Sequence, residues 1–527
     1  MTTASTVLTT TLRKLAAAVA VLAWGAAAVA AAPTGAGPMM PTIDIDRPVV
    51  LAGKGGPVYI LVRFAVPEEV GDDESERSDL NLALVLDRSG SMEARGKMEY
   101  LKRAAAMVVD KLKPRDRLAV VEYDDRITLL WPSAPVESPR MIKQLIAALT
   151  ARGSTDLTGG MMRGVEVVGE HAGRDAIDRV LLLSDGLANA GITSPSEIRR
   201  LVRRAKKDGV QISTLGLGVD YNEDLMQDIA ENAGGNYYFI EHPNQMAGIF
   251  QRELLALFHT VARNVDFEFR TADAVRGVEV FGFPSETAAG TTKIEVDDFY
   301  AGETRSMLLR LDIAARGPGR IRLGTVSMAY HDVQADRPRE FVSEIAIDAT
   351  LDTAAVDAGT NQQVRVEAAL VEAETAHAQS VRLYQEGRRD QAREILLKLE
   401  RELKASNATL ADARIASKVE ALEVERDEQE RVTGSAMASK AYIKRSKQRL
   451  YQAQKGKRSL YRLQEGDQGF EVRRLQEAMN RAGYYTGPMD GHFGALLTES
   501  VKAYQRSEKL SVDGIAGPAT LRNLNLY

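Results

Sequence analysis

The chain has 527 residues, with 68 basic and 73 acidic side chains and a formal net charge of -5. This length exceeds what one hydrophobic core organises and predicts several domains, while the near balance of charge argues against a nucleic-acid partner. The absence of cysteine excludes disulfides, thiolate catalysis, cysteine metal sites and a lipid anchor on an amino-terminal cysteine. We therefore expect a modular protein.

The amino-terminal segment predicts export. Arg13 and Lys14 precede an alanine-rich apolar stretch that ends in the small residues "AVA", which is the pattern of a cleaved signal peptide. We assign residues 1–32 to this signal and expect a periplasmic or cell-envelope, wall-associated protein. An uncleaved anchor helix is the alternative, because about 18 apolar residues lie at the lower limit for spanning a bilayer; only then would the protein be held in a membrane.

Apolar residues at every second position predict strands in residues 41–70 and 264–350. These residues are Val58, Ile60, Val62 and Phe64 in the first range, and Val265, Phe267, Phe269, Leu309, Leu311, Ile313, Phe341, Ile345 and Ile347 in the second. We expect one antiparallel, β-sandwich-like domain built from both ranges. Two separate small β-elements are the alternative.

Residues 80–262, which lie between these two ranges, alternate short apolar runs with amphipathic stretches. Runs such as "NLALVLD" and "RVLLLSDG" have the composition of buried strands. Stretches such as "SEIRRLVRRAKKDG" carry apolar residues at helical spacing. The alternation predicts a doubly wound, mostly parallel α/β domain, inserted into the β-domain.

Small oxygen-bearing side chains follow two of the predicted strands. Asp87, Ser89 and Ser91 come after "LALVL", Asp185 ends "LLLSD", and Thr155 opens a predicted helix in "GSTDL". Ligands of open α/β sheets bind beyond the carboxyl ends of the strands, and hard divalent cations prefer oxygen ligands. The pattern therefore predicts a metal site, although Asp87 as a helix cap and Asp185 as a turn former are the purely structural alternative.

The strings "LVLDRSGSM", "GSTDL" and "LLLSDG", in this order, resemble the metal-ion-dependent adhesion site of von Willebrand factor type A domains over about residues 80–262. The resemblance implies that Mg²⁺, or Mn²⁺ or Ca²⁺ in its place, is bound and that an acidic residue of a protein ligand completes the coordination. Ser154 stands where the family usually has glycine. The implied metal ligands are Asp87, Ser89, Ser91, Thr155 and Asp185.

Two segments follow the β-domain. Residues 364–432 have one-face helical spacing with a turn at Gly387; they resemble one tetratricopeptide-type hairpin, but a plain helical spacer is the simpler interpretation because such arrays need about three repeats. Residues 436–462 contain nine lysines and arginines and no acid. We interpret them as a basic, solvated linker, with attraction to wall or lipid phosphates as the alternative.

Residues 463–527 predict a small helical domain with glycine-marked turns. The string "GYYTGPMDGHFG", followed by "SVKAYQ" and "DGIAGPATL", resembles the type 1 peptidoglycan-binding domain, a three-helix module. The resemblance implies peptidoglycan as a partner. Candidates for stacking on its sugars are the exposed members of Tyr484, Tyr485 and Tyr504.

The sequence contains none of the common catalytic motifs that we considered. No Gly-x-Ser-x-Gly, Ser-x-x-Lys or His-Glu-x-x-His occurs, and "GSMEARGKM" departs from the spacing of a phosphate loop. We therefore expect no enzyme and no catalytic residues, but an envelope scaffold or adhesion-type protein that binds peptidoglycan and, through the metal, a protein partner. A peptidoglycan-targeted hydrolase or hydrolase accessory factor is the main alternative; an intracellular partner of a chaperone-like ATPase would require that residues 1–32 are no export signal.

Overall fold

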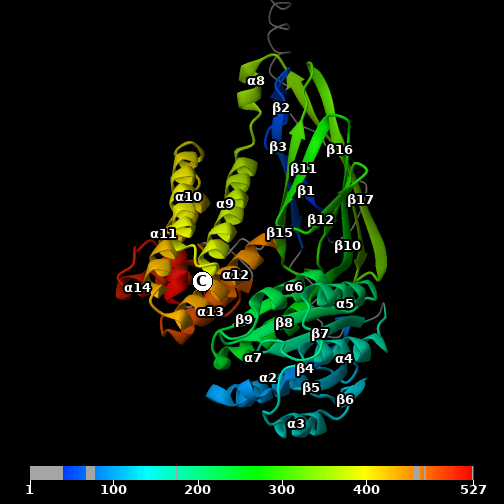
Figure 1. Cartoon of the computed structure of the whole chain (residues 1–527). Coiled ribbons are helices and arrows are strands. Elements are labelled where there is room, and N and C mark those ends of the chain that lie inside the picture. Colours follow the sequence, from blue (N-terminus) through cyan, green and yellow to red (C-terminus); the bar gives the residue numbers. More distant parts are fainter. Residues whose placement is uncertain are drawn as a thin grey trace, which may run out of the picture.

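The computed structural model describes residues 39–66, 77–173, 176–455, 463–467, 470–524 and 526. Figure 1 shows the α/β domain at the bottom, the β-sandwich above it, and the helices and carboxyl-terminal module on the left. The predicted signal peptide, residues 1–32, lies outside the described residues. Within the described part of the chain, no helix has both the length and the apolar character that a membrane span requires.

The α/β domain is built on a six-stranded sheet in the order β6-β5-β4-β7-β8-β9. All neighbouring pairs are parallel except β5 with the edge strand β6. The strands β4, β5, β7 and β8 are almost wholly buried, as their continuous apolar runs predicted. The strands are β4 (Asp79–Asp87), β5 (Arg117–Tyr123), β6 (Ile127–Pro135), β7 (Ala176–Ser184), β8 (Gln211–Leu217) and β9 (Tyr237–Ile240).

Helices cover both faces of this sheet, which makes the domain doubly wound, as expected. One face packs against α2, α3 and α7 and the other against α4, α5 and α6. Two short 3₁₀ segments, η1 (Gly90–Gly96) and η2 (Pro243–Gln245), precede α2 and α7. The helices are α2 (Lys97–Lys111), α3 (Pro139–Ala147), α4 (Leu157–Gly169), α5 (Pro195–Lys207), α6 (Glu223–Ala233) and α7 (Met246–Phe258).

The β-sandwich has two sheets, in the orders β1-β3-β15-β11 and β12-β13-β10-β16-β17-β2, with β14 paired to β10. Every alternating apolar residue named from the sequence is buried in the core between them. The strands are β1 (Thr42–Ile45), β2 (Val49–Leu51), β3 (Gly56–Ala65), β10 (Thr260–Thr271), β11 (Val275–Phe281), β12 (Ser285–Ala288), β13 (Thr291–Glu295), β14 (Phe299–Tyr300), β15 (Thr304–Ile313), β16 (Gly319–Asp332) and β17 (Arg337–Thr350).

Strand pairing confirms the predicted insertion of the α/β domain. β3, before the insertion, pairs along its length with β15, after it, from Ala65 with Thr304 to Gly56 with Ile313. β2 pairs in parallel with the end of β17. The alternative of two separate β-elements is therefore excluded.

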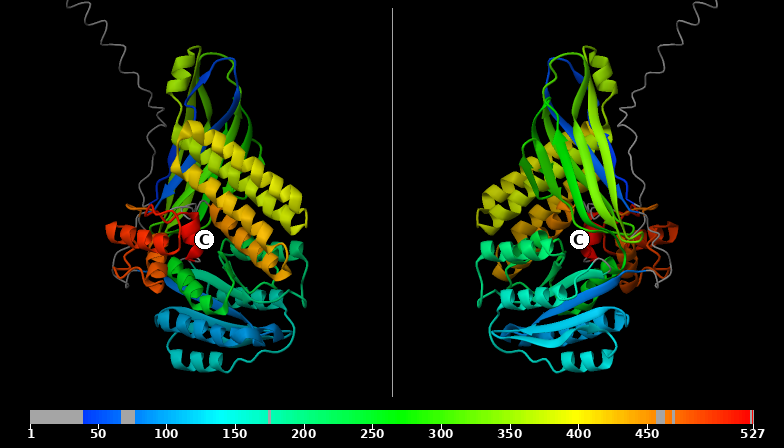
Figure 2. Two further views of the ribbon diagram at one scale, coloured as in Figure 1. Left: turned by 90° about the vertical axis from the view of Figure 1, so that its left-hand side faces the viewer. Right: turned by 90° about the vertical axis from the view of Figure 1, so that its right-hand side faces the viewer.

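Helices α9 to α12 form the segment between the sandwich and the carboxyl-terminal module. After the short α8 (Thr353–Ala358), they are α9 (Gln362–Gln385), α10 (Arg389–Leu410), α11 (Ala413–Val432) and α12 (Ala436–Gln454). α9 lies on the outer face of the four-stranded sheet, where Val364, Ala368 and Val371 pack against Leu61 and Leu308. Because α12 packs back on α9, the four helices form a closed group rather than an open repeat array (Figure 2).

The expectation of a solvated linker over residues 436–462 is wrong for its described part, because α12 is a packed helix. Lys444 is 2% exposed; it donates to the carbonyl of Tyr221 at 2.7 Å and pairs with Glu223. Arg445 bridges Glu241 of the α/β domain and Glu428 of α11. This role could not be predicted from the sequence because the partners in the α/β domain, Glu223 and Glu241, lie 221 and 204 residues away from Lys444 and Arg445.

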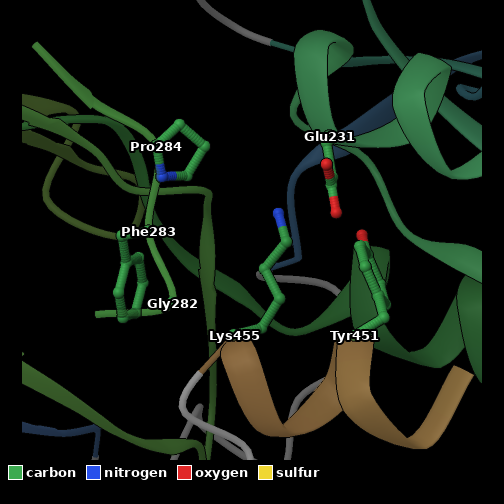
Figure 3. Close-up of a pocket in the computed structure, with 6 residues that line it drawn as sticks. All are labelled: Glu231, Gly282, Phe283, Pro284, Tyr451 and Lys455. Atoms are coloured by element: carbon green, nitrogen blue, oxygen red, sulfur yellow. The ribbon is translucent and has the colours of Figure 1, made fainter. Parts of the chain in front are cut away.

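A cavity of about 250 Å³ lies where α12, α6 and the sandwich meet (Figure 3). Tyr451 at the end of α12 donates its hydroxyl to the carbonyl of Gly235 at 3.1 Å, and Lys455 pairs with Asp297. Glu231 accepts from the side chain of Gln227 at 2.7 Å. Since these polar groups are bonded within the protein, we regard the junction as structural.

The carboxyl-terminal module contains an internal repeat. Gln476 donates to Asp490 Oδ1 and the carbonyl of His492 and accepts from the amide of Gly491. The same three bonds join Gln505 to Asp513, Ile515 and Gly514, whose φ of +79° suits glycine. The helices are α13 (Phe470–Arg481), α14 (Ala495–Ser507) and α15 (Pro518–Asn523).

Candidate metal centre

Asp87, the last residue of β4, is the most firmly held carboxylate of the predicted site. It is wholly buried, and β4 runs parallel to β7, with Leu86 opposite Leu183. Ser184, the residue after Leu183, therefore lies beside Asp87 and donates its hydroxyl to Asp87 Oδ2 at 2.8 Å. The amide of Ser89 donates to Asp87 Oδ1 at 2.8 Å, so both carboxylate oxygens are oriented by bonds from adjacent strand ends.

The two serines connect Asp87 to Asp185. Ser89 and Ser91 place their hydroxyl oxygens 3.0 Å apart, and Ser91 donates to Asp185 Oδ1 at 2.6 Å. Ser89 and Asp185 are buried, whereas Ser91 is exposed. The group therefore opens to solvent at Ser91.

Thr155 approaches the same group from the start of α4. It is 3% exposed, and a β-carbon placed on Gly186 would lie 3.3 Å from its Oγ1 and 3.6 Å from Ser91 Oγ. The hydroxyls of Thr155 and Ser91 therefore border Gly186 together. With this placement, the structure brings all five predicted ligands to one edge of the sheet.

Backbone bonds hold the loops around these side chains together. Gly90 donates its amide to the carbonyl of Gly153 at 3.1 Å, and Arg152 donates to that of Arg88 at 2.7 Å. These bonds dock the loop of Thr155 onto the loop of Ser89. Ser154, the departure from the family pattern, lies next to Gly153 and is exposed.

Asn189 is a site residue that the motif did not indicate. Its Oδ1 accepts from the amide of Thr155 at 2.9 Å, and the Thr155 carbonyl accepts from the amides of Asn189 and Ala190. Asn189 thus ties the loop after β7 to the loop before α4. The only sequence signal was its place shortly after Asp185.

A charge network lies behind the site. Arg88 pairs with Glu122 at 2.8 Å and with Asp124 at 3.2 Å, and Arg152 also pairs with Asp124 at 2.8 Å. Burial opposes ionisation of Asp124, but the amide of Arg126 and the side chain of Arg152 outweigh it and hold its pKa below the ordinary value. These ion pairs hold Arg88, the residue next to Asp87, in place and do not involve the carboxylate of Asp87.

The electrostatics of the site favour a cation. Burial, followed by the negative charge of Asp185, raises the pKa of Asp87 to about 6. Two close, buried carboxylates repel each other, and a metal ion relieves this repulsion. The donor set of two carboxylates and three hydroxyls is hard and suits Mg²⁺, Mn²⁺ or Ca²⁺. In the described chain, no group of three or more His, Cys, Asp or Glu side chains is placed to hold a metal; the present site has two carboxylates, and hydroxyl oxygens would supply its remaining protein ligands.

The tyrosines proposed for sugar stacking differ in exposure. Tyr485 is 3% and Tyr504 6% exposed, and both belong to the core of the carboxyl-terminal module. Neither offers a free ring face, so these two candidates are corrected to core residues. Tyr484 is half-buried, packs edge-on against Tyr504 and donates to Ser507 at 2.7 Å.

The two domain resemblances are confirmed by family models. Residues 81–252 match the von Willebrand factor type A domain, and residues 468–524 match the putative peptidoglycan-binding domain. The chain therefore contains a von Willebrand factor type A domain, inserted in a β-sandwich, and a carboxyl-terminal peptidoglycan-binding domain.

Curated relatives share the central part of the chain. The protein sll0103 of Synechocystis sp. is 26% identical over 281 residues, which cover 51% of this chain and 66% of the relative. YfbK of Escherichia coli is 32% identical over 197 residues, 36% of this chain and 34% of the relative. Human inter-alpha-trypsin inhibitor heavy chain H4 is 23% identical over 320 residues, 57% of this chain and 32% of the relative. The chain thus spans between about a third and two thirds of their lengths.

Solved structures share the fold over a larger part of the chain. A von Willebrand factor type A protein from Catenulispora acidiphila has a TM-score of 0.59 at 18% identity and covers 74% of this chain and 90% of its own. The ArnB paralog VWA2 from Sulfolobus acidocaldarius has a TM-score of 0.50 at 15% identity and covers 77% and 97%. At these identities the likeness concerns the fold alone.

Proposed function

We propose that this protein is a non-enzymatic scaffold of the cell envelope. Its carboxyl-terminal domain binds peptidoglycan, and its von Willebrand factor type A domain binds a protein partner through a divalent metal ion. Export through residues 1–32 would bring both domains to the same compartment; the proposal of export rests on the sequence pattern alone.

The observation that carries the proposal is the convergence of five oxygen-bearing side chains at one sheet edge. Asp87, Ser89, Thr155 and Asp185 are buried there, while Ser91 reaches solvent. A buried site with one open side suits a cation that is held by the protein and remains accessible to an incoming ligand.

Each side chain has a defined part in this proposal. Asp87 and Asp185 would supply the negative charge that holds the ion, and the hydroxyls of Ser89, Ser91 and Thr155 would supply neutral oxygens. The bound ion would supply a Lewis-acidic position for a carboxylate, because two protein carboxylates and neutral hydroxyls leave it with a demand for negative charge. The protein loops hold these groups in place before the partner arrives.

Contacts between the domains support a scaffold rather than independent modules. α15 packs on α11, where a β-carbon placed on Gly517 would lie 3.7 Å from Oε2 of Glu420. α12 joins the same helical group to the type A domain through Lys444 and Arg445. A partner bound at the metal site would therefore be held in a defined position relative to the wall-binding module.

The test uses the purified protein in two assays. Cosedimentation with isolated peptidoglycan tests the wall-binding half, and capture of acidic envelope proteins with Mg²⁺ or with EDTA tests the metal-dependent half. We expect Asp87→Ala to lose Mg²⁺-dependent capture and to retain cosedimentation. Capture that is equal in EDTA and Mg²⁺ would refute the metal-dependent half, and the absence of cosedimentation would refute wall binding.

A further inference from the structure

Lys97 lies at the metal site, although the motif gives it no role. Its ammonium pairs with Asp185 Oδ2, and its Nζ lies 3.4 Å from the carbonyl oxygen of Ser91. The side chain is 12% exposed and that of Asp185 is 0% exposed. The pair therefore stands in a largely dehydrated environment, where charges interact more strongly than at the surface.

The position of Lys97 in its helix is unfavourable without such a partner. Lys97 is the first residue of α2, after Gly96 in a left-handed conformation with φ +69°. A positive charge at a helix amino terminus opposes the helix dipole. The ion pair with Asp185 explains why a lysine stands at this position, because the lysine does not stabilise α2.

Both oxygens of Asp185 are thus engaged in this structure. Oδ1 accepts from Ser91 and Oδ2 from Lys97. An ion that uses Asp185 has to share this carboxylate with a fixed positive charge or displace it, and two cations close to one carboxylate repel each other.

We propose that Lys97 is the counter-ion of the metal-free site: its ammonium neutralises Asp185 when no metal is bound and competes with the divalent cation for that carboxylate. The inference rests on the proposed function. It adds that the type A domain folds without metal, with Asp185 paired to a fixed positive charge, and that Lys97 lowers the metal affinity of the site. Metal occupancy would then follow the free metal concentration.

The test is Mg²⁺ and Mn²⁺ titration by calorimetry on the full chain. We expect Lys97→Met, which keeps the length of the side chain and removes its charge, to bind metal at least about tenfold more tightly, which corresponds to about 1.4 kcal/mol. Lys97→Arg keeps the charge and is expected to remain near the wild-type Kd. Lys102→Met is the matched control, because Lys102 pairs with Glu99 on the same helix.

A second readout is the thermal unfolding midpoint, measured without and with metal. In EDTA, Lys97→Met is expected to unfold at a lower temperature than the wild type, because Asp185 loses its counter-ion, and saturating Mg²⁺ is expected to raise its midpoint by more than that of the wild type. A purely structural role would lower the midpoint without tightening metal binding.

Three outcomes would overturn the inference. Equal metal affinity of the wild type and Lys97→Met would show that Lys97 does not compete with the metal, and it would leave the proposed metal site intact. If Lys97→Arg or Lys102→Met increased the metal affinity as much as Lys97→Met does, the charge of Lys97 would not be the cause of the increase. Absence of metal binding by every protein, wild type included, would refute the proposed function and this inference with it.

Discussion

Asn189 and Thr155 are joined by reciprocal hydrogen bonds: Asn189 Oδ1 accepts from the Thr155 amide at 2.9 Å, and the Thr155 carbonyl accepts from the Asn189 amide at 3.2 Å. Of these two bonds, only the first depends on the side chain of Asn189. The placement of the Thr155 hydroxyl therefore depends on a residue in another loop.

Replacement of Asn189 by alanine is expected to weaken metal binding about threefold to tenfold, because loss of one hydrogen bond of about 1 kcal/mol loosens the loop of Thr155. Asn189→Asp should retain more affinity, since it restores the acceptor. Calorimetric titration measures both. Wild-type affinity in Asn189→Ala would show that the backbone bonds alone position Thr155.

Removal of the Asp87 carboxylate is expected to abolish measurable Mg²⁺ binding with little loss of fold. β4 keeps its buried apolar residues in Asp87→Ala, and the burial penalty of the carboxylate disappears together with its bonds. Ser154→Gly is the control, because Ser154 is exposed and is not among the predicted ligands. Metal titration and circular dichroism of the two variants check this expectation; retained Mg²⁺ binding in Asp87→Ala would contradict the assigned site.

The contact of α12 with the type A domain is expected to weaken in acid. Burial raises the pKa of Glu223, but the hydrogen bond and charge of Lys444 outweigh this and hold the pKa below the ordinary value of 4.5. A carboxylate with a depressed folded-state pKa adds stability that is fully present above the unfolded value and is lost as the pH falls through the folded value. Amide exchange of α12, compared above and below about pH 4, should therefore show faster opening in acid.

Glu223→Gln should reduce that acid sensitivity, since it removes the titrating group. Asp220→Asn should not, because the pair of Asp220 with Lys440 is exposed and contributes little. Identical acid sensitivity in the wild type and Glu223→Gln would place the titration elsewhere.

The internal repeat of the carboxyl-terminal module predicts similar effects at Gln476 and Gln505. Both side chains are buried, and each loses several bonds on truncation, so Gln476→Ala and Gln505→Ala should each destabilise the module by about 2–4 kcal/mol. Amide exchange of α13 and α14 in the full protein measures the effect, with exposed Arg506→Ala as the control. A destabilisation confined to one glutamine would show that the two turns are not energetically equivalent.

Tyr485 and Tyr484 should separate stability from wall binding. Tyr485→Ala removes a core side chain and is expected to cost about 3 kcal/mol or more. Tyr484→Ala leaves most of the core in place and should have little effect on stability. Reduced cosedimentation of this variant with peptidoglycan would assign sugar contact to the half-buried ring. Measurement of both thermal stability and cosedimentation distinguishes the two effects.

The main architecture could be predicted because its signals are local. Period-two alternation around Val62 and Leu311 indicated the sandwich strands, and the apolar run before Asp87 indicated a buried strand with ligands at its end. The five predicted ligands lie together because parallel neighbouring strands end at the same edge.

The remaining features depend on partners that are distant in the sequence. Lys444 is charged in a helix without acids, and nothing near it indicates that Tyr221 and Glu223 bury it. Lys97 and Asn189 belong to no repeating pattern, so only the folded loops reveal their bonds to Asp185 and Thr155. The burial of Tyr485 beside the half-buried Tyr484 likewise depends on helix packing that two adjacent tyrosines do not reveal.

The insertion of the type A domain also determines how it would carry mechanical load. The chain enters the domain from β3, in the four-stranded sheet, and leaves it into β10, in the other sheet. Tension on a partner held at Asp87 would be divided between two sheets, each strand restrained by its neighbours along most of its length. Such an attachment resists extraction of either strand alone, so we expect tension between the candidate metal site and the carboxyl-terminal module to separate the ion pairs of α12 before it extracts a sandwich strand.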